Sequence, residues 1–357
     1  MKNKLFNLAL FLALTLLYVI CTHANDKIKK CSLPKIKGIV NLDSECIYNH
    51  SIIIKKSNTF LNCNNSLIDG KNTLQIGINI TGEIENIEVT NCNVKNFVTS
   101  GIMISSGLQI TENSNVDFYY NNAPNDITIN NSVIDNNGKT GVTFNSYTNN
   151  SVLKNSIIIN SGGVGVYLSQ SSKEITIINN KIAFNGYKFK GREGIAIDSS
   201  ANNIIKDNLF DSNKSGAVFL YKNCGERHNG KHGIKRWQHS NNNLITDNIF
   251  QNEKIGVWLA SRQSQDLRKW NCLDTPVDAN GRFYKDYANF NTIKRNTFCD
   301  TTTGIINEGN NNYVANNTFN TDAHKWYYEP YIKNQKPDGE KSFGNIIINN
   351  KYSQCLK

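Results

Sequence analysis

The sequence repeats one short pattern along most of its length. An apolar run follows a glycine, polar turn residues come next, and a second apolar run ends in Asn-x-Phe. Residues 192–210 (REGIAIDSSANNIIKDNLF) hold one complete copy. The first half recurs at 216–221 and 256–261, and the second half recurs at 243–250 and 291–298. A unit this short cannot bury its apolar side alone, so it must stack on its neighbours.

The spacing of the repeats predicts a three-sided parallel β-helix. The shortest intervals between closing asparagines are 24, 25 and 21 residues. That length fits three strands of about five residues each plus their turns. Longer intervals of 40 and 48 residues indicate inserted loops. We expect the closing asparagines to stack as a side-chain ladder: Asn91, Asn131, Asn155, Asn180, Asn208, Asn248, Asn296 and Asn317.

Alternation within the run after each glycine predicts β-strands and the side chains that point inward. The residues one and three places after the glycine are apolar, which is typical of a strand with one buried face. A helical interpretation fails because β-branched residues and Asn dominate and turn residues break every run. The predicted inward pairs are Ile102/Ile104, Val142/Phe144, Val166/Leu168, Ile195/Ile197, Ala217/Phe219 and Val257/Leu259.

The chain divides into four parts. Two lysines, an apolar run from Leu5 to Ile20 and small residues before Asn25 predict a secretory signal peptide. No later stretch is apolar enough to predict a membrane span. The expected parts are a signal peptide (1–24), an N-terminal cap (25–70), coils with insertions at about 187–192, 223–240 and 263–288 (71–320), and a C-terminal strand and cap (321–357).

Composition points to an exported protein with an acidic partner. The formal net charge is +10, although charged residues make up only 19% of the chain. Basic proteins bind uronate polysaccharides, anionic lipid or nucleic acid. No nucleic-acid motif is present, so we expect an acidic polysaccharide. We expect a monomer that is secreted or periplasmic.

Cysteine usage agrees with export. The chain has nine cysteines, and removal of Cys21 with the signal peptide leaves eight. An even number in an exported chain suggests disulfides. We interpret Cys63 and Cys92 as stacked core thiols. The expected pairs are Cys31–Cys46, Cys224–Cys272 and Cys299–Cys355.

Two cations are predicted to meet on one wall of the solenoid. Lys222 and Arg262 each lie six residues after the glycine of their coil. In successive coils they would lie about 5 Å apart. Two cations this close repel each other unless an anion lies between them. A sugar carboxylate, Asp198 or Glu193 could be the anion between them.

We expect the insertions to leave the solenoid at this same edge and to form the walls of a groove over the coils between about residues 190 and 270. This groove would be rich in cations and aromatic rings, which bind anionic sugars by ion pairing and stacking. The alternative is that the insertions are ordinary solvated loops. The candidate substrate-binding residues are Arg192, Glu193, Asp198, Trp258, Lys231, His232 and Trp237.

These coils resemble the exported right-handed parallel β-helix proteins of the pectate-lyase-like superfamily. The periodic Asn-x-Ile and Asn-x-Phe motifs carry the resemblance over most of the chain after residue 24. Residues 192–200, 220–224 and 257–264 resemble a subgroup of bacterial β-helix-repeat proteins. The resemblance implies an all-β, single-stranded, right-handed parallel β-helix. It also implies polysaccharide lyases, uronan C5-epimerases, polygalacturonase-type hydrolases or non-catalytic binders.

Within that range, a lyase or C5-epimerase is our first hypothesis. Both reactions remove the proton beside a uronate carboxylate, whose charge must be neutralised. We expect Arg262 and Arg227 to neutralise it. Lys222 would be the base, with a pKa lowered by Arg262, and His228 is the second candidate. Tyr221 or His232 would protonate the leaving oxygen.

Two other functions stay open. A glycoside hydrolase needs paired carboxylates, for which Glu193, Asp198 and Glu226 are the candidates. The Asp-Pro-His-Asp motif of mannuronan epimerases and polygalacturonase-type Asp pairs are absent. A non-catalytic glycan-binding or envelope protein would need the groove but no base. Ca²⁺ is a conceivable cofactor, but no tight run of oxygen ligands is present, so we predict no metal and no cofactor.

Overall fold

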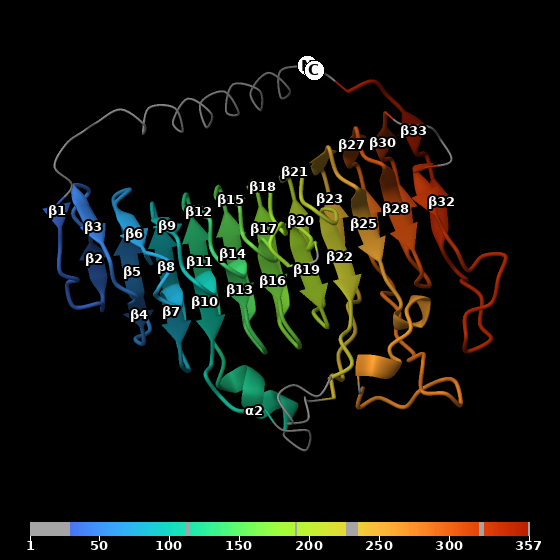
Figure 1. The fold of residues 1–357 in the computed structure, drawn as a ribbon, viewed down its shortest axis with the longest axis horizontal. Helices are drawn as coiled ribbons and strands as arrows, with labels where there is room; N and C mark the ends of the chain where they lie inside the picture. The colour runs from blue at the N-terminus through green and yellow to red at the C-terminus, as the bar shows by residue number, and fades with distance from the viewer. Residues whose placement is uncertain are drawn as a thin grey trace.

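The computed structural model describes residues 29–110, 115–189, 191–225, 235–270, 272–320 and 325–355. The predicted signal peptide lies outside these residues. The described residues form three parallel sheets of 10, 11 and 12 strands. We call the 12-stranded sheet A, the 11-stranded sheet B and the 10-stranded sheet C. Each complete coil contributes one strand to sheet C, then one to sheet B, then one to sheet A. Figure 1 shows the coils stacked side by side along the long axis of the molecule. This architecture confirms the predicted parallel β-helix.

Sheet C begins each complete coil and carries the candidate site. Its strands are β4 (Ile52–Ile54), β7 (Ile76–Thr81), β10 (Ser100–Ser105), β13 (Thr140–Phe144), β16 (Val166–Leu168), β19 (Ile195–Asp198), β22 (Val218–Tyr221), β25 (Ile255–Leu259), β28 (Thr303–Asn307) and β31 (Tyr327–Tyr328).

Sheet B follows after a turn that bends the chain around the core. Its strands are β2 (Ile39–Asn41), β5 (Thr59–Asn62), β8 (Glu85–Thr90), β11 (Asn125–Asn130), β14 (Asn149–Lys154), β17 (Lys173–Ile178), β20 (Ile204–Lys206), β23 (Leu244–Thr246), β26 (Thr292–Lys294), β29 (Tyr313–Ala315) and β32 (Ile346–Ile348).

Sheet A closes each coil. Its strands are β1 (Lys29–Lys30), β3 (Cys46–Tyr48), β6 (Leu67–Asp69), β9 (Asn93–Lys95), β12 (Val133–Asp135), β15 (Ile157–Ile159), β18 (Lys181–Ala183), β21 (Leu209–Asp211), β24 (Ile249–Gln251), β27 (Thr297–Cys299), β30 (Thr318–Phe319) and β33 (Lys351–Tyr352).

Short helices occur only in insertions within the described part of the chain. Helix α2 (Val116–Asn121) follows β10, and two 3-10 turns, η1 (Arg262–Ser264) and η2 (Arg268–Trp270), follow β25. None of the described helices is long and apolar enough to cross a bilayer.

The core explains the phenylalanine of the repeated motif. Phe210, Phe250, Phe298 and Phe319 occupy successive strands of sheet A, and their nearly parallel rings stack with centroids 4.6–5.0 Å apart. All four side chains are buried. Stacked aromatic pairs contribute about 0.5–1.5 kcal/mol beyond the area that they bury.

The predicted inward residues are confirmed in every coil except one. Ile195 pairs with Val218 and Ile197 pairs with Leu220, so Val218 and Leu220 point into the core. The predicted pair Ala217/Phe219 is therefore wrong, because Phe219 faces outward. Gly216 has a left-handed backbone (φ 145°) and lies one residue ahead of the usual glycine position, which Ala217 occupies in this coil.

The asparagine ladder is present, but the predicted residues belong to two different positions. From Asn180 onward, each buried amide donates to the side-chain oxygen of the next coil, with Nδ2–Oδ1 distances of 2.9–3.0 Å as far as Asn350. Asn91, Asn131 and Asn155 instead lie one residue earlier, where the backbone is left-handed (φ 44–56°). Asparagine tolerates that conformation, so both positions select the same residue type.

Four disulfides join described cysteines. The predicted pairs Cys31–Cys46, Cys224–Cys272 and Cys299–Cys355 are confirmed. The interpretation of Cys63 and Cys92 as free thiols is wrong, since they form the fourth disulfide. These two residues follow β5 and β8 in adjacent coils, and stacking brings their Cα atoms to 4.8 Å. Disulfides are typical of proteins that fold in oxidising compartments.

One internal ladder ends on an acid rather than an amide. Asn185 donates to Asn213 at 3.0 Å, and Asn213 donates to Oε1 of Glu253 at 2.7 Å. Oε2 of Glu253 has no hydrogen-bond partner among the described residues. Burial raises the pKa of Glu253 to about 8 from its ordinary value of 4.5. The folded protein therefore keeps this proton at a pH where the unfolded chain releases it.

We predict that Glu253→Gln stabilises the protein more at pH 8 than at pH 5. Because the folded pKa is raised, the native state binds more protons than the unfolded state, and wild-type stability falls as pH rises from 4.5 towards 8. Glutamine keeps the Oε1 acceptor and cannot ionise. The expected gain at pH 8 is on the order of 3 kcal/mol, measured from denaturant unfolding midpoints.

Glu88→Gln, on the outer face of sheet B, is the matched control. It should leave the pH dependence of unfolding unchanged. An equal pH slope for Glu253→Gln and the wild-type protein would show that Glu253 is ionised in the folded state.

Candidate functional site

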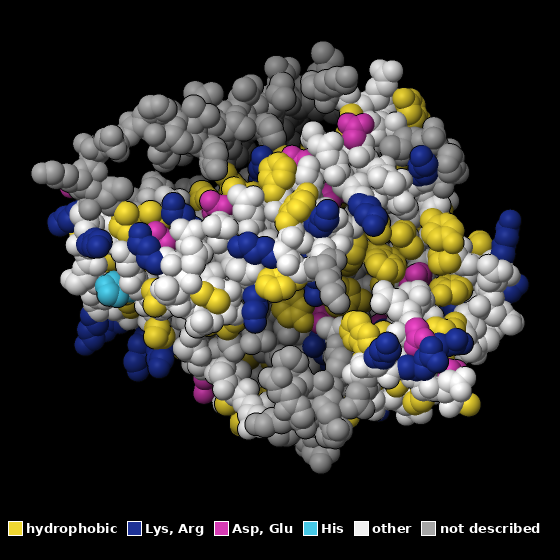
Figure 2. Space-filling view, viewed as in Figure 1, with side chains coloured by type: hydrophobic (Ala, Val, Ile, Leu, Met, Phe, Trp, Pro, Cys, Tyr) yellow, Lys and Arg dark blue, Asp and Glu magenta, His cyan; other side chains and the backbone are white. Residues whose placement is uncertain are grey.

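The outer face of sheet C carries a row of large side chains in its C-terminal half. Strand pairing places Tyr167, Ala196, Phe219, Trp258, Ile306 and Tyr328 in one row across six neighbouring strands. Their neighbours along each strand point into the core, so this row faces outward. The rings of Phe219 and Trp258 meet edge to face at 5.3 Å. Figure 2 shows apolar side chains gathered over β22, β25 and β28.

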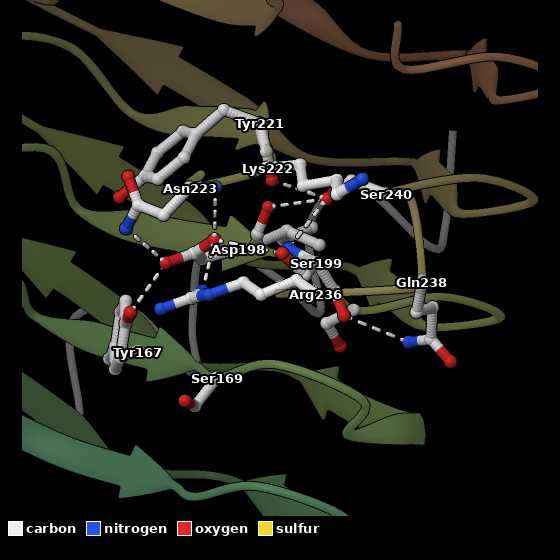
Figure 3. Close-up of polar contacts among 12 residues, drawn as sticks. Tyr167, Ser169, Asp198, Ser199, Tyr221, Lys222, Asn223, Arg236, Gln238 and Ser240 are labelled. Atoms are coloured by element: carbon white, nitrogen blue, oxygen red, sulfur yellow. Dashed lines mark hydrogen bonds and ion pairs between the residues drawn. The ribbon is translucent and has the colours of Figure 1, made fainter. Parts of the chain in front are cut away.

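Beside this row, Asp198 is the centre of a buried polar cluster (Figure 3). Asp198 ends β19 and has no exposed surface. Its Oδ2 accepts hydrogen bonds from the Tyr167 hydroxyl and the Asn223 amide, both at 2.6 Å. Its Oδ1 lies 2.5 Å from Nη1 of Arg236 and 3.0 Å from the backbone nitrogen of Asn223. Both carboxylate oxygens are thus satisfied.

The charges within this cluster shift the pKa values of its members. Burial raises the pKa of Tyr167, and the negative charge of Asp198 raises it further. Burial disfavours the charge of Arg236, but Asp198 outweighs burial and raises the pKa of Arg236. A buried ion pair with additional donors of this kind holds its geometry firmly. It fixes the end of the first insertion, which carries Arg236, against sheet C.

A second cluster joins Arg192, Glu193 and Tyr221. Arg192 donates two hydrogen bonds to the Glu193 carboxylate, at 3.1 and 3.0 Å, and a third to the Tyr221 hydroxyl at 2.8 Å. Tyr221 in turn donates to Oε1 of Glu193 at 2.8 Å. Burial and the Glu193 charge raise the pKa of Tyr221. The Arg192 side chain is 40% exposed, so it reaches the surface although its guanidinium is held by Glu193 and Tyr221.

A third cluster surrounds Asp286 of the second insertion. Its Oδ1 lies 2.7 Å from Nδ1 of His239, and its Oδ2 accepts a hydrogen bond from the backbone nitrogen of Lys222 at 3.0 Å. Nε of Arg262 lies 3.9 Å from the same oxygen, and Arg262 also pairs with Asp274. Lys222 and Arg262 therefore lie on the same edge of the solenoid, as predicted.

The anion between these two cations differs from the expectation. We expected a sugar carboxylate, Asp198 or Glu193, but Asp286 and Asp274 are the carboxylates beside them. The predicted alignment of Lys222 with Arg262 in the neighbouring coil is also wrong by one residue. Leu220 pairs with Leu259, so Lys222 aligns with Ser261 rather than with Arg262.

Lys222 differs from the other residues of the third cluster. It is only 6% exposed, yet its ammonium group forms no hydrogen bond or ion pair with any described residue. Burial lowers its pKa, against the opposing charges of Asp286 and Asp274, and Arg262 lowers it further. A nearly buried lysine without a paired carboxylate is costly to keep charged.

The structure brings most of the predicted residues to one edge. Figure 1 shows helix α2 and the described residues of the second insertion beyond the C-terminal ends of the sheet C strands. Glu193, Tyr221 and Arg192 meet in one cluster, Asp198 lies next to it, and Trp258 belongs to the outward row. Trp237 lies apart and donates its indole N–H to Tyr147 at 3.4 Å. The predicted residues outside the described part of the chain are Glu226, Arg227, His228, Lys231 and His232.

Several residues of the site were not identified from the sequence. Arg236 and His239 lie at the end of the first insertion, and Asp274 and Asp286 lie in the second. The sequence holds no repeat there that would show which side chains return to the sheet. Tyr167 could have been identified from the sequence, since it occupies the outward position of its coil.

Removing Arg236 should destabilise the protein because it leaves Asp198 buried without its counter-ion. We predict that Arg236→Met lowers the free energy of unfolding by about 3–5 kcal/mol. The double variant Asp198→Asn/Arg236→Met should recover part of that loss, since asparagine needs no counter-ion. Denaturant unfolding of the two single variants and the double variant measures the coupling. Additive losses would show that the pair is not coupled.

Comparison with known proteins agrees with this architecture. Residues 76–228 match the model of the family described as "Right handed beta helix region". A search of curated protein sequences finds no match. An alginate lyase from Paenibacillus sp. str. FPU-7 aligns with a TM-score of 0.50 and 11% identity, over 90% of this chain and 92% of the lyase.

Two further solved structures have lower scores. The A-module of a mannuronan C-5 epimerase from Azotobacter vinelandii has a TM-score of 0.43 and 12% identity, covering 89% of each chain. A DFA-IIIase from Arthrobacter chlorophenolicus A6 has a TM-score of 0.43 and 12% identity, covering 88% of this chain and 78% of the enzyme. The match over residues 76–228 and the three parallel sheets show that the chain has the right-handed parallel β-helix fold.

Proposed function

We propose that this protein acts on a polysaccharide that carries carboxylate groups and removes the proton beside a carboxylate, as a lyase or C5-epimerase does. The observation that carries the proposal is the pair of neighbouring residues at the end of β22. Tyr221 is held protonated between Arg192 and Glu193, and Lys222 has a lowered pKa and an ammonium group with no partner among the described residues. The signal-peptide pattern and the four disulfides support an exported protein.

The outer face of sheet C offers the groups that a charged polysaccharide needs. Sugar rings pack against aromatic side chains, and Trp258 and Tyr328 supply these in the outward row. Arg192 supplies a partly exposed guanidinium whose Nε and Nη2 hold Glu193 and Tyr221, and its Nη1, which has no partner among the described residues, would donate to a substrate carboxylate. The net charge of +10 would attract a polyanion.

The reaction assigns one role to each residue. The amine of Lys222 takes the proton from the carbon beside the carboxylate, and the electron pair of that bond moves onto the carboxylate. Arg192 stabilises the charge that develops there. In the lyase reaction, the electrons return to form a double bond as the glycosidic oxygen leaves, and Tyr221 protonates that oxygen. In the epimerase reaction, Tyr221 protonates the carbon from the opposite face.

The burial of these groups agrees with their roles. A lysine is a useful base only when part of it is neutral, and a lowered pKa increases that fraction at neutral pH. A raised pKa keeps Tyr221 protonated, as an acid must be. We assign carboxylate neutralisation to Arg192 rather than to Arg262, although both arginines pair with carboxylates, because the Arg192 side chain is 40% exposed and the Arg262 side chain only 7%. Arg227 and the two histidines of the first hypothesis stay predictions.

Hydrolysis receives less support. Glu193 and Asp198 are both buried and paired with arginines. Glu308, which follows β28, has the raised pKa of a general acid, about 7, caused by burial. Three strand spacings separate it from Asp198, about 14 Å at the usual spacing. The paired carboxylates of glycosidases are about 5–9.5 Å apart.

We predict that Lys222→Gln lowers kcat/KM on a uronate polymer by about 10²–10⁴-fold. Alginate, pectate and glycosaminoglycans are the substrates to test. Absorbance of the new double bond reports the lyase, proton exchange at C5 measured by NMR reports the epimerase, and reducing-end release reports hydrolysis. Wild-type activity should rise with pH as Lys222 loses its proton, and Tyr221→Phe should lose activity without losing binding.

Lys294→Gln, on the outer face of sheet B, is the matched control and should keep full activity. Lys222→Gln should also raise the thermal midpoint at pH 7, because it removes a nearly buried cation that pairs with no carboxylate in the described part of the chain. A lysine with only a structural role would lower the midpoint when replaced. The proposal fails if no uronan gives a product or exchanges its C5 proton, or if Lys222→Gln retains wild-type activity.

A further inference from the structure

A hollow lies between helix α2 and the end of the first insertion, next to the turns that lead into sheet B. It has a volume of about 420 Å³, within the range of small-molecule sites. It forms where helix α2, the end of the first insertion and the turns before β20 and β23 meet. Its lining residues are Tyr120, Lys173, Ala201, Asn202, Trp237, Gln238, His239, Asn241 and Asn242.

Hydrogen bonds to the solenoid hold the walls of this hollow in place. The Gln238 amide donates to the backbone oxygens of Ser172 at 3.0 Å and Ser199 at 2.9 Å. The Tyr120 hydroxyl donates to the backbone oxygen of Ser171 at 2.7 Å. Two segments that are more than 100 residues apart in the sequence are therefore fixed against adjacent coils. A ligand would meet a site that is already formed, which reduces the entropy lost on binding.

The side chains around the hollow suit a sugar acid. Trp237 is 51% exposed and offers an aromatic face. The ammonium group of Lys173 lies 4.5 Å from the centre of the Tyr120 ring, and its ion pair with exposed Glu174 is long, at 3.6 Å. Asn241 and Asn242 add amides that bind hydroxyl groups. An aromatic face, a cation and amides together recognise both the ring and the carboxylate of a uronate.

His239 contributes a further polar group at the rim. Its Nδ1 contacts Asp286, and its Nε2 has no partner among the described residues. The side chain is 38% exposed. When Nδ1–H donates to the carboxylate, Nε2 is free to bind a hydroxyl or, once protonated, a carboxylate. Asp286 also accepts from the backbone of Lys222, so the hollow and the proposed base share one carboxylate.

We propose that this hollow is a second binding site for a uronate unit, separate from the face of sheet C. The sugar ring stacks on Trp237, and its carboxylate lies between Lys173 and His239. The inference rests on the proposed function for its ligand class, a polymer of sugar acids. It adds a site, joined to the proposed base through Asp286, that would hold a further unit of the same polysaccharide or a second polysaccharide molecule during the reaction.

Titration calorimetry of the full-length Lys222→Gln variant tests the proposal, because this variant binds without turnover. The ligands are a tetrasaccharide of uronic acid and a neutral tetrasaccharide of similar length. We expect two uronate sites per chain. Trp237→Ala, added to Lys222→Gln, should remove one site or weaken it by about tenfold or more. Lys173→Gln should weaken the same site, and the neutral sugar should bind at least about tenfold less tightly.

Trp270→Ala is the matched control, since Trp270 is similarly exposed (43%) but lies outside the hollow. It should leave both sites intact. The proposal is overturned if Trp237→Ala and Trp270→Ala bind alike while both keep the parent thermal midpoint, or if the neutral sugar binds equally well. Absence of activity in the wild-type protein would overturn the proposed reaction instead, and the Trp237-dependent site would still be measurable.

Discussion

The rest of the structure depends on the hydrogen bonding that joins each coil to the next. From Asn180 to Asn350, one side-chain oxygen accepts both the backbone nitrogen and the amide of the preceding coil. A shift of one residue would leave both donors buried and unpaired, at a cost of about 1–3 kcal/mol each. The ladder therefore fixes the register of the coils from Asn180 onward, and this register fixes which residues reach the ends of their sheet C strands.

This strict register explains why the fold was predictable from the sequence. Inward positions must be apolar in every coil, so the pattern recurs and its period gives the number of sides. Where the prediction failed, a local feature interrupted the repeat. Gly216 lies one residue before the usual glycine position, so counting from it wrongly assigned Phe219 to an inward position. Asn91, Asn131 and Asn155 were assigned to the inner ladder because left-handed turns and buried ladders both favour asparagine.

The candidate site was predictable only where it lies on the coils. Arg192, Glu193, Asp198 and Tyr221 could be placed by counting from a glycine, since their positions follow the repeat. Arg236, which pairs with Asp198, and the His239–Asp286 pair come from insertions, whose paths depend on contacts with distant parts of the chain. Cys63 and Cys92 belong to the first group, because stacking alone brings them together. Their pairing was missed because apolar neighbours also suit a free thiol.

The Cys224–Cys272 disulfide has a consequence for the order in which the solenoid comes apart. It joins the start of the first long insertion to the middle part of the second and closes a covalent loop that contains β23, β24 and β25. Solenoids lose their repeats progressively from the ends, since each repeat contacts only its neighbours. When unfolding from an end of the solenoid reaches this loop, the Cys224–Cys272 disulfide still holds the adjacent coils together. The coils that carry Tyr221 and Lys222 should thus be among the last to unravel.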